Sequence, residues 1–178
     1  MLITISGLPG SGKTTVARLL SKRLRLPHIY AGDLYRKEAE ARGLSLDEFN
    51  RLSEHDHSID RELDAKMATY ARTGNAVLEG RLAGFITVQE GVDAFKVWLT
   101  ASDEVRARRV AQREGSDWST VAALNDARQH SDAKRYREIY GFDLDDTSIY
   151  DLTLDCDTER PEALAERILA RVRERSRR

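Results

Sequence analysis

Two hydrophobic patterns alternate along the chain. Short apolar runs rich in β-branched residues predict buried strands, and longer stretches with apolar residues three or four apart predict helices packed along one face. The expected strands cover residues 2–6, 28–30, 76–78, 95–99 and 152–154. The expected helices cover about 14–24, 33–43, 58–74, 102–114 and 119–140, with others opening at 45 and near 161. Because strands alternate with helices, we expect an α/β fold with a five-stranded, parallel, doubly wound sheet flanked by helices.

Polar residues and glycines mark the expected helix ends. Ser45 and Glu48 have the spacing of a capping box, in which the serine side chain accepts from the glutamate's backbone N–H and the glutamate reaches back. Ser58 is the expected cap of the next helix. Glycine readily adopts the left-handed conformation that ends a helix. On this basis we expect helices to stop at Gly74, Gly115 and Gly141.

The first expected strand runs directly into a glycine-rich segment, residues 7–14. This segment matches the phosphate-binding loop, G-x-x-x-x-G-K-[ST], and a helical pattern follows it at once. Glycines let backbone N–H groups turn toward a phosphate, and the helix presents its positive end to the same anion. We therefore expect Lys13 to reach the β- and γ-phosphates of a nucleotide and the Thr14 hydroxyl to ligate Mg²⁺. A plain glycine-rich turn would explain neither residue.

Length and composition indicate one ordinary globular domain, or a core domain with small insertions. The chain has 178 residues, and its 29 Lys and Arg nearly balance its 30 Asp and Glu, so the overall charge indicates neither nucleic acid nor a membrane. The arginine-rich end, residues 171–178, is interpreted as a solvated helix terminus, with RNA contact as the alternative. Cys156 is alone, which favours a reducing compartment. With no signal peptide or membrane helix expected, we predict a cytoplasmic enzyme.

Glu79 is expected at the carboxyl end of the third strand, where ligands bind in parallel sheets. A carboxylate at this place could hold Mg²⁺ directly or through water, and Arg81 could meet a phosphate. The alternative is an ion pair at the end of the strand.

Arginines recur on two expected helices. Arg109 and Arg113 share a helix face, and Arg109 has no acid three or four residues away in either direction. Because this face has little local compensation, we expect an anion from outside. A solvated arginine face is the alternative, and it is the interpretation we favour for Arg106 and Arg108. On the next helix, one face carries Arg128, Asp132 and Arg135, which form either a ligand site or a self-satisfied ion-pair ladder.

Two aspartates share a face of the expected helix 58–74. Asp60 and Asp64 are one turn apart and could accept a hydrogen bond from a nucleobase, or they could be solvated. Arg61 lies about 100° round the helix from Asp60. Nearby, His55 and His57 flank an aspartate, but this spacing on a helix does not converge well on a metal ion.

Taken together, these motifs resemble those of the nucleoside monophosphate kinases, and most closely the archaeal-type cytidylate kinases. The resemblance covers essentially the whole chain. The loop alone is common to many nucleotide-binding families, and its combination with Glu79-Gly80-Arg81 and the arginine helix is more specific. The matching segments are residues 7–14, 31–36, 77–81, 109–113, 128–136, 140–143 and 150–152.

The resemblance implies a P-loop kinase core with an acceptor-binding helical insertion at about 33–74 and a mobile lid at about 114–127. The expected catalytic residues are Lys13, Arg81, Arg109, Arg113 and Arg135. The expected ATP-binding residues are Gly7, Leu8, Pro9, Gly10, Ser11, Gly12, Lys13, Thr14, Thr15 and Arg109. The expected acceptor-binding residues are Asp33, Arg36, Asp60, Gly80, Arg81, Arg128, Asp132 and Arg135. Thr14 and Glu79 are the expected metal-binding residues, with Mg²⁺ as the cofactor.

One position departs from the resemblance. Ala31 stands where bacterial cytidylate kinases usually carry Ser or Thr, so base recognition must come from elsewhere. Asp60 paired with an arginine from another element, with Arg81 as the candidate, is the expected reader.

The expected reaction transfers the γ-phosphoryl group of ATP to CMP, and also to dCMP, in a monomeric enzyme. A kinase acting on AMP, UMP or a shikimate- or gluconate-like acceptor is the alternative. A P-loop GTPase is disfavoured, because the Asn-Lys-x-Asp and Asp-x-x-Gly elements are missing from the sequence.

Overall fold

A parallel β-sheet forms the centre of the protein. The computed structural model describes residues 1–177, apart from the side chain of Asp47, and within them the strand order is β2-β3-β1-β4-β5. Every neighbouring pair is parallel, so the predicted fold class is confirmed. The strands are β1 (Leu2–Gly7), β2 (His28–Tyr30), β3 (Ala76–Glu79), β4 (Phe95–Thr100) and β5 (Leu152–Asp155).

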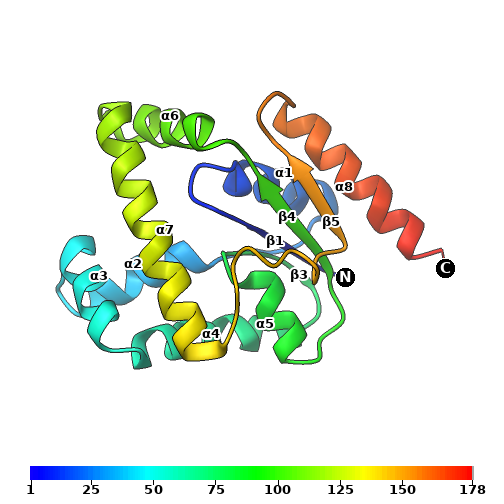
Figure 1. The fold of residues 1–178 in the computed structure, drawn as a ribbon. Helices are drawn as coiled ribbons and strands as arrows, with labels where there is room; N and C mark the ends of the chain where they lie inside the picture. Colours follow the sequence, from blue (N-terminus) through cyan, green and yellow to red (C-terminus); the bar gives the residue numbers. More distant parts are fainter. Residues whose placement is uncertain (178) are drawn as a thin grey trace.

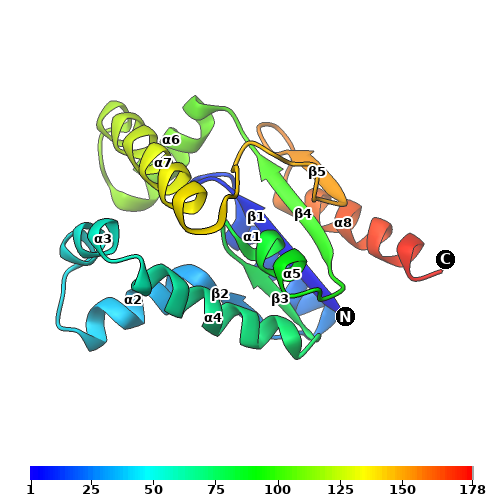
Figure 2. The same cartoon turned by 60° about the horizontal axis from the view of Figure 1, so that its bottom comes forward.

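Helices cover both faces of this sheet and extend beyond one end of it (Figure 1). They are α1 (Lys13–Leu24), α2 (Ala31–Ala41), α3 (Leu46–His55), α4 (Ser58–Arg72), α5 (Ala83–Gln89), α6 (Asp103–Glu114), α7 (Trp118–Tyr140) and α8 (Pro161–Arg175). Figures 1 and 2 both place α2–α3 and α6–α7 beyond the carboxyl ends of the strands. That is the end where the sequence analysis expects a ligand.

The strand sequences explain why both faces of the sheet are covered. All six residues of β1 are buried, and successive side chains point to opposite faces. Ile3 and Ile5 belong to the core that contains α1 and α8. Leu2 belongs to the opposite core, which contains α4 and α5. A strand that is apolar on both faces is typical of a parallel sheet between helical layers.

Most of the predicted helix ends are confirmed. Ser45 and Glu48 form the complete capping box of α3, and Gly115 and Gly141 are the left-handed C-caps of α6 and α7. Gly74, just beyond α4, also has a positive φ of 68°. The predicted cap at Ser58 is wrong, because Ser58 is already the first helical residue and its N–H and hydroxyl donate to Asp56.

Two other elements differ from the prediction. Helix α5 was not expected, and α2 begins at Ala31, directly after β2, instead of after a turn at residues 31–33. Helix α5 is held at its start by a hydrogen bond from Gly84 N–H to the Ser6 hydroxyl, 3.1 Å, which ties it to β1. The Gly84 backbone also lies against the Tyr150 ring, where a side chain would collide.

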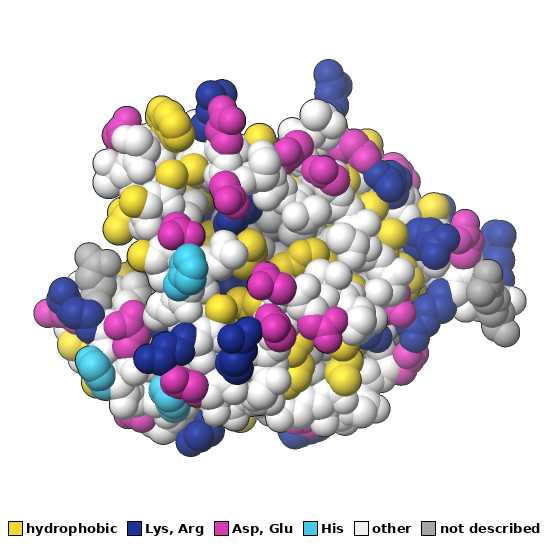
Figure 3. All heavy atoms as spheres, viewed as in Figure 1, with side chains coloured by type: hydrophobic (Ala, Val, Ile, Leu, Met, Phe, Trp, Pro, Cys, Tyr) yellow, Lys and Arg dark blue, Asp and Glu magenta, His cyan; other side chains and the backbone are white. Residues whose placement is uncertain are grey.

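The surface carries charges of both signs. On the face shown in Figure 3, basic and acidic side chains are interspersed. In the arginine-rich end, Arg171 pairs with Glu174 and Arg175 pairs with Asp93, while Arg178 lies outside the described residues. Over the part of the chain that the structure describes, no helix combines the length and apolarity needed to cross a membrane.

Candidate active site

The glycine-rich loop has the backbone conformation that its sequence predicts. Gly7, Gly10 and Gly12 all have positive φ values. At Gly10, with φ of 82°, an added Cβ would collide with the backbone carbonyl oxygen of Arg106 on α6. Glycine is required here both for the left-handed conformation and for the close approach of α6. The loop is therefore held between the end of β1 and the first turn of α6.

Lys13 begins α1 and turns back over the loop. Its Nζ donates to the Leu8 carbonyl oxygen at 2.7 Å. Burial lowers its pKa to about 7, opposed by the nearby Glu79 carboxylate and reinforced by the positive charges of Arg81, Arg106 and Arg128. Lys13 is thus a cation surrounded by other cations, and a polyanion bound to the loop would stabilise its charged form.

Thr14 and Glu79, the two expected metal-binding residues, are in contact. The Thr14 hydroxyl donates to Glu79 Oε1 at 2.5 Å, and Glu79 is completely buried at the end of β3. The other carboxylate oxygen, Oε2, lies 2.8 Å from Nε2 of His28 on β2. Thr14 and His28 therefore contact opposite oxygens of one carboxylate. The contact with His28 is of the kind that the alternative at the strand end expects, and the binding of a metal ion by Thr14 and Glu79 stays a prediction.

The expectation for Arg106 is wrong. Arg106 is only 4% exposed, whereas the side chain of Arg108, two positions on, is 65% exposed and pairs with Glu104. Arg106 pairs with Asp103, and its Nη1 donates to the Pro9 carbonyl oxygen at 3.3 Å. It is turned inward because α6 packs against the loop. Only Arg108 belongs to the solvated face that was expected for both.

The other two arginines of α6 have separate environments. Arg109 donates to the Cys156 carbonyl oxygen at 2.6 Å, and its Nη1 lies 3.9 Å from the place that a Cβ on Gly12 would take. It therefore borders the loop. Arg113 is exposed and pairs with its neighbour Glu114 at 2.6 Å, so the structure does not bring it to the loop beside Arg109.

A buried group of charges lies between β3, α4 and α7. Arg81 pairs with Asp132, and Asp132 also accepts from Arg135 Nη2 at 2.9 Å. Arg135 Nε in turn lies 3.2 Å from Asp60 Oδ2. We call Arg81, Asp132, Arg135 and Asp60 the buried charge cluster. Asp60 is thus next to Arg135, whereas the sequence analysis had suggested Arg81 as its partner.

The buried charge cluster keeps polar capacity for a ligand. Within the described residues, Asp60 Oδ2 and Arg135 Nε face each other without hydrogen-bond geometry. Burial raises the pKa of Asp60, and Arg135 opposes that shift. Unsatisfied polar atoms in a buried cluster are costly, which favours a substrate that completes their bonding.

Arg128 and Arg36 are the other two arginines among the expected acceptor-binding residues. The positive charge of Arg81 lowers the pKa of Arg128 to about 10, and burial of the guanidinium contributes further. Two alternatives were given for Arg128, Asp132 and Arg135 on α7, a ligand site and an ion-pair ladder. Asp132 and Arg135 pair with each other, as in a ladder, whereas Arg128 is close to the positive charge of Arg81. Arg36 pairs with Asp33 and lies over the Tyr30 ring, 5.1 Å from its centroid.

Gly80 approaches α2 so closely that a Cβ added to it would lie 2.9 Å from Ala31 Cβ.

Asp64 and Tyr140 link α4 to the end of α7. The Tyr140 hydroxyl donates to Asp64 Oδ2 at 2.6 Å. Burial raises the pKa of Asp64 to about 7, despite the Tyr140 hydrogen bond that opposes the shift, and burial also raises the pKa of Tyr140. A pocket of about 230 Å³ lies beside the pair, between α4 and α5. Asp60 and Asp64 therefore both face α7, as their shared helix face predicts.

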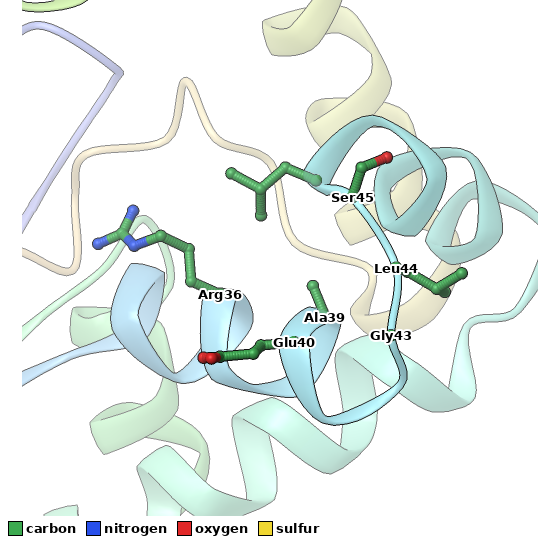
Figure 4. Close-up of a pocket in the computed structure, with 7 residues that line it drawn as sticks. Arg36, Ala39, Glu40, Gly43, Leu44 and Ser45 are labelled. Atoms are coloured by element: carbon green, nitrogen blue, oxygen red, sulfur yellow. The ribbon is translucent and has the colours of Figure 1, made fainter.

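A larger pocket of about 510 Å³ lies at the junction of α2 and α3. Figure 4 shows Arg36 and Glu40 on α2 on one side of it and Ser45 at the start of α3 on the other. Arg36 is the only one of the expected acceptor-binding residues among those that line it in the described structure, so this pocket lies beside the candidate site and is not its centre.

Sequence reasoning missed several contacts of the candidate residues. They include those of His28 with Glu79, of Tyr140 with Asp64, and of Arg106 with the loop. A strand order in which β2 neighbours β3 would have placed His28 near Glu79. No local sequence signal gives the contacts of Tyr140 and Arg106, because both depend on how α7 and α6 dock.

The fold and this site define a P-loop kinase. Solved structures with the same fold include an uncharacterized protein from Eubacterium ventriosum, TM-score 0.72 and 17% identity, covering 96% of both chains. Another is a shikimate kinase from Bacteroides thetaiotaomicron, TM-score 0.63 and 16% identity, covering 97% of this chain and 98% of that one.

The model of the cytidylate kinase-like family matches residues 2–158, and the chain belongs to this family. It is 47% identical over 162 residues to a cytidylate kinase of Methanopyrus kandleri, covering 87% of this chain and 84% of that protein. It is 45% identical over 173 residues to a cytidylate kinase of Halobacterium salinarum, covering 97% of this chain and 89% of that protein.

Proposed function

We propose that this protein is a cytidylate kinase, which transfers the γ-phosphoryl group of ATP to CMP, and also to dCMP. The observation that carries the proposal is the positive charge around the loop lysine: Lys13 is buried over the loop, and the charges of Arg81 and Arg128, from different elements, help to lower its pKa. Phosphoryl transfer needs little covalent help from a protein. It needs in-line positioning of the reactants and positive charge around the transferring group. The family relationship supports CMP as the acceptor.

Each part of the site has a role in this reaction. The loop from Gly7 to Thr15 would hold the ATP phosphates, with Arg109 beside it. Arg81 and Arg135, the cations of the buried charge cluster, would hold the acceptor phosphate or the transferring phosphoryl group. Arg36, beside Asp33, would hold the acceptor phosphate from α2, and Arg128 with Asp132 would hold the acceptor nucleoside. Arg113, at the far end of α6, would join the ATP side only when that end of the helix moves with the lid.

A magnesium ion fits the residues at the end of β3. The Thr14 hydroxyl and the Glu79 carboxylate supply oxygen ligands, which Mg²⁺ prefers, and this ion usually takes its remaining ligands from substrate phosphates and water. When bound, the ion would neutralise charge that develops on the phosphates. No general base is part of the proposal.

Two segments of the chain have proposed roles in enclosing the substrates. The insertion at about 33–74 would bind the acceptor, and residues at about 114–127, between α6 and the first turns of α7, would form a lid that excludes water. Contacts outside the proposed lid, between the later turns of α7 and the insertion, connect the helix that follows the lid to the acceptor-binding segment. The Ser131 hydroxyl donates to Glu54 Oε1 at 2.9 Å, and Tyr140 donates to Asp64.

We further propose that the enzyme acts as a monomer in the cytoplasm. The single thiol, Cys156, is buried and needs no oxidising compartment. Light scattering of the purified protein, with and without nucleotides, tests the oligomeric state; a stable dimer under assay conditions would contradict it.

The experiment that tests the function is an acceptor screen. Initial rates with ATP and Mg²⁺ are measured against CMP, dCMP, UMP, AMP and shikimate. We expect CMP to have the highest kcat/KM. A best rate with AMP or shikimate would overturn the choice of acceptor and leave a kinase, whereas ATP hydrolysis independent of every acceptor would overturn the kinase.

Lys13→Ala is the control that ties turnover to the loop. We expect kcat to fall by at least ~100-fold, the scale of losing one electrostatic stabiliser of a transition state. Lys37→Ala, on α2, is the matched lysine variant and should keep normal turnover. Near-normal turnover in Lys13→Ala would contradict the site.

A further inference from the structure

A histidine that the proposed reaction does not use contacts the proposed metal-binding carboxylate. His28 is one of three residues in β2, and its side chain is 16% exposed. Its Nε2 lies 2.8 Å from Glu79 Oε2. The Thr14 hydroxyl already donates to the other oxygen, Oε1. A carboxylate only accepts hydrogen bonds, so His28 is the donor to Oε2.

This pair of donors fixes the orientation of Glu79. With no exposed surface, the carboxylate cannot be held by bulk solvent and depends on protein partners. His28 holds Oε2 from the β2 side and so leaves the Oε1 edge turned toward Thr14 and the loop. That edge is the one that would face a metal ion bound with nucleotide.

The ring of His28 also contacts a residue on the acceptor side of the site. His28 and Tyr30 are stacked, with ring centroids 6.2 Å apart and planes 9° apart. The Arg36 guanidinium in turn lies 5.1 Å from the Tyr30 ring centroid, in cation–π range. A Cβ at Gly32 would collide with the hydroxyl end of the Tyr30 ring, so this end of the ring lies against the first turn of α2.

We propose that His28 is a positioning residue with two separable functions. Its Nε2–H orients Glu79 for the metal–nucleotide side, and its ring orients Tyr30, and through it Arg36, for the acceptor side. The inference rests on the proposed kinase function. It adds a continuous set of contacts, Thr14–Glu79–His28–Tyr30–Arg36, that runs from the nucleotide loop to the acceptor-binding insertion.

The two functions use different parts of the imidazole, so two substitutions separate them. His28→Gln keeps an N–H donor at a similar reach and removes the ring. His28→Phe keeps the ring and removes the donor. His55→Gln and His55→Phe, at an exposed position on α3, are the matched controls.

The first readout is binding of ADP by calorimetry over a range of Mg²⁺ concentrations, which involves no acceptor and no turnover. We expect His28→Phe to need about tenfold more Mg²⁺ for tight ADP binding, because partners that orient a metal ligand contribute 10- to 100-fold in affinity. His28→Gln should stay within about twofold of the wild type.

The second readout is KM for CMP, measured at saturating ATP and Mg²⁺. We expect it to rise at least ~3-fold in His28→Gln and to stay near wild type in His28→Phe, on the scale of one weakened cation–π contact. Tyr30→Leu leaves His28 and Glu79 in place and should raise KM for CMP in the same way. This variant keeps the acceptor arm testable if a His28 variant fails to fold.

Outcomes that contradict the inference are distinct from failure of the proposed function. If wild-type protein does not phosphorylate CMP, the proposed function is wrong, while the ADP–Mg²⁺ readout still tests the Glu79 arm. If His28→Phe binds ADP with unchanged Mg²⁺ dependence, His28 does not orient Glu79. If His28→Gln and Tyr30→Leu leave KM for CMP unchanged, the acceptor arm is overturned.

Discussion

At the scale of single residues, environment separates arginines that look alike in sequence. Arg106 and Arg108 lie two positions apart on α6 and point in different directions. Arg106 is buried against the loop and donates to Pro9, whereas Arg108 lies in solvent with Glu104. A surface ion pair contributes little to stability, but a buried side chain with several hydrogen bonds contributes much more.

We therefore predict unequal effects of Arg106→Ala and Arg108→Ala. Arg106→Ala should reduce the free energy of unfolding by about 1–3 kcal/mol, and Arg108→Ala by less than about 0.5 kcal/mol. For a domain of this size, the first change lowers Tm by about 2–4 °C per kcal/mol. Thermal unfolding of both variants measures this. Equal Tm values for the two variants would show that the loop does not depend on Arg106.

The same residues show where sequence reasoning stops. The loop can be identified from sequence because a strand, glycines and a helix follow one another in a phosphate-binding loop. Glu79 can be identified because it ends a short apolar strand. The burial of Arg106 does not follow, because Asp103 at three residues' distance is equally compatible with an exposed pair. Only the docking of α6 against Gly10 decides it. The contact of His28 with Glu79 could not be predicted either, because the two residues lie 51 positions apart in the sequence.

At the scale of elements, the contact between the loop and α6 makes glycine necessary at position 10. Gly10 and Gly91 both have left-handed backbones, with φ of 82° and 63°. A Cβ on Gly91 would meet nothing within 4 Å, whereas one on Gly10 would collide with the α6 backbone. An added side chain would therefore have the same conformational cost at both glycines, but only at Gly10 would it also collide with a neighbouring helix.

Gly10→Ala should accordingly destabilise the protein more than Gly91→Ala. We expect Gly91→Ala to cost about 1 kcal/mol, from the left-handed conformation alone. Gly10→Ala should cost a further ~1–3 kcal/mol from overpacking and weaken ADP binding at least ~10-fold as the loop moves. Chemical denaturation and calorimetry measure the two effects. If the variants behave alike in both, the approach of α6 does not constrain the loop.

The link between α4 and α7 makes stability depend on pH. Burial raises the pKa of Asp64 from 3.8 in the unfolded chain to about 7. A raised folded-state pKa means that the folded protein binds more protons, so this group's contribution to stability is fully present below pH ~4 and is lost as pH rises to ~7. In the Asp64→Asn variant, the asparagine side chain resembles the protonated form of Asp64 and does not titrate.

Asp64→Asn should thus gain stability relative to wild type as pH rises. We expect its free energy of unfolding, minus that of wild type, to be at least ~1 kcal/mol more favourable at pH 8 than at pH 5, since one unit of pKa shift corresponds to about 1.4 kcal/mol. Urea unfolding at several pH values gives the difference. Asp145→Asn, an exposed control, should show none, and a flat difference for Asp64→Asn would show that Asp64 ionises normally.

Helices with a long periodic pattern could be predicted from sequence, whereas the short helix α5 could not, for a physical reason. Helix α4 extends over 15 residues and buries Ile59, Leu63 and Met67 along one face, which is the spacing of a helix. Helix α5 has seven residues, AGFITVQ, and no side-chain cap. Fewer than two turns give no helical period, and the residues are β-branched or apolar enough to suit a strand. Tertiary contacts with β1 and Tyr150 decide its conformation.

At the scale of the whole molecule, the candidate site joins β3, α4 and α7. Their relative positions follow from the strand order, in which β3 and β4 lie on either side of β1. Spacing along α7 identified Asp132 and Arg135 as neighbours, but it did not identify Arg135 as the partner of Asp60, because that contact joins residues 75 positions apart. The arrangement gives Asp60 a specific place beside a buried arginine.

That place makes Asp60 the proposed reader of the acceptor base. Cytosine offers an amino donor at N4 and acceptors at N3 and O2, whereas uracil offers an acceptor at O4 and a donor at N3. The Asp60 carboxylate would accept from the amino group of cytosine and repel the carbonyl oxygen of uracil, and Arg135 would donate to N3 or O2. A purine would overfill a site of pyrimidine size.

The last prediction concerns the ratio of kcat/KM for CMP and UMP in wild type and in Asp60→Asn. A well-buried hydrogen-bonding site can reject a mismatched analogue by ~10⁴-fold, and a site that water still enters rejects it less, so we expect a ratio of at least ~10 in wild type. The ratio should fall several-fold in Asp60→Asn, because an amide can present an N–H to O4. Asp64→Asn, one turn along α4, is the matched control and should keep the wild-type ratio. Because each ratio is measured within one variant, a loss of stability cancels. An unchanged ratio in Asp60→Asn would reject Asp60 as the reader while leaving the reaction in place.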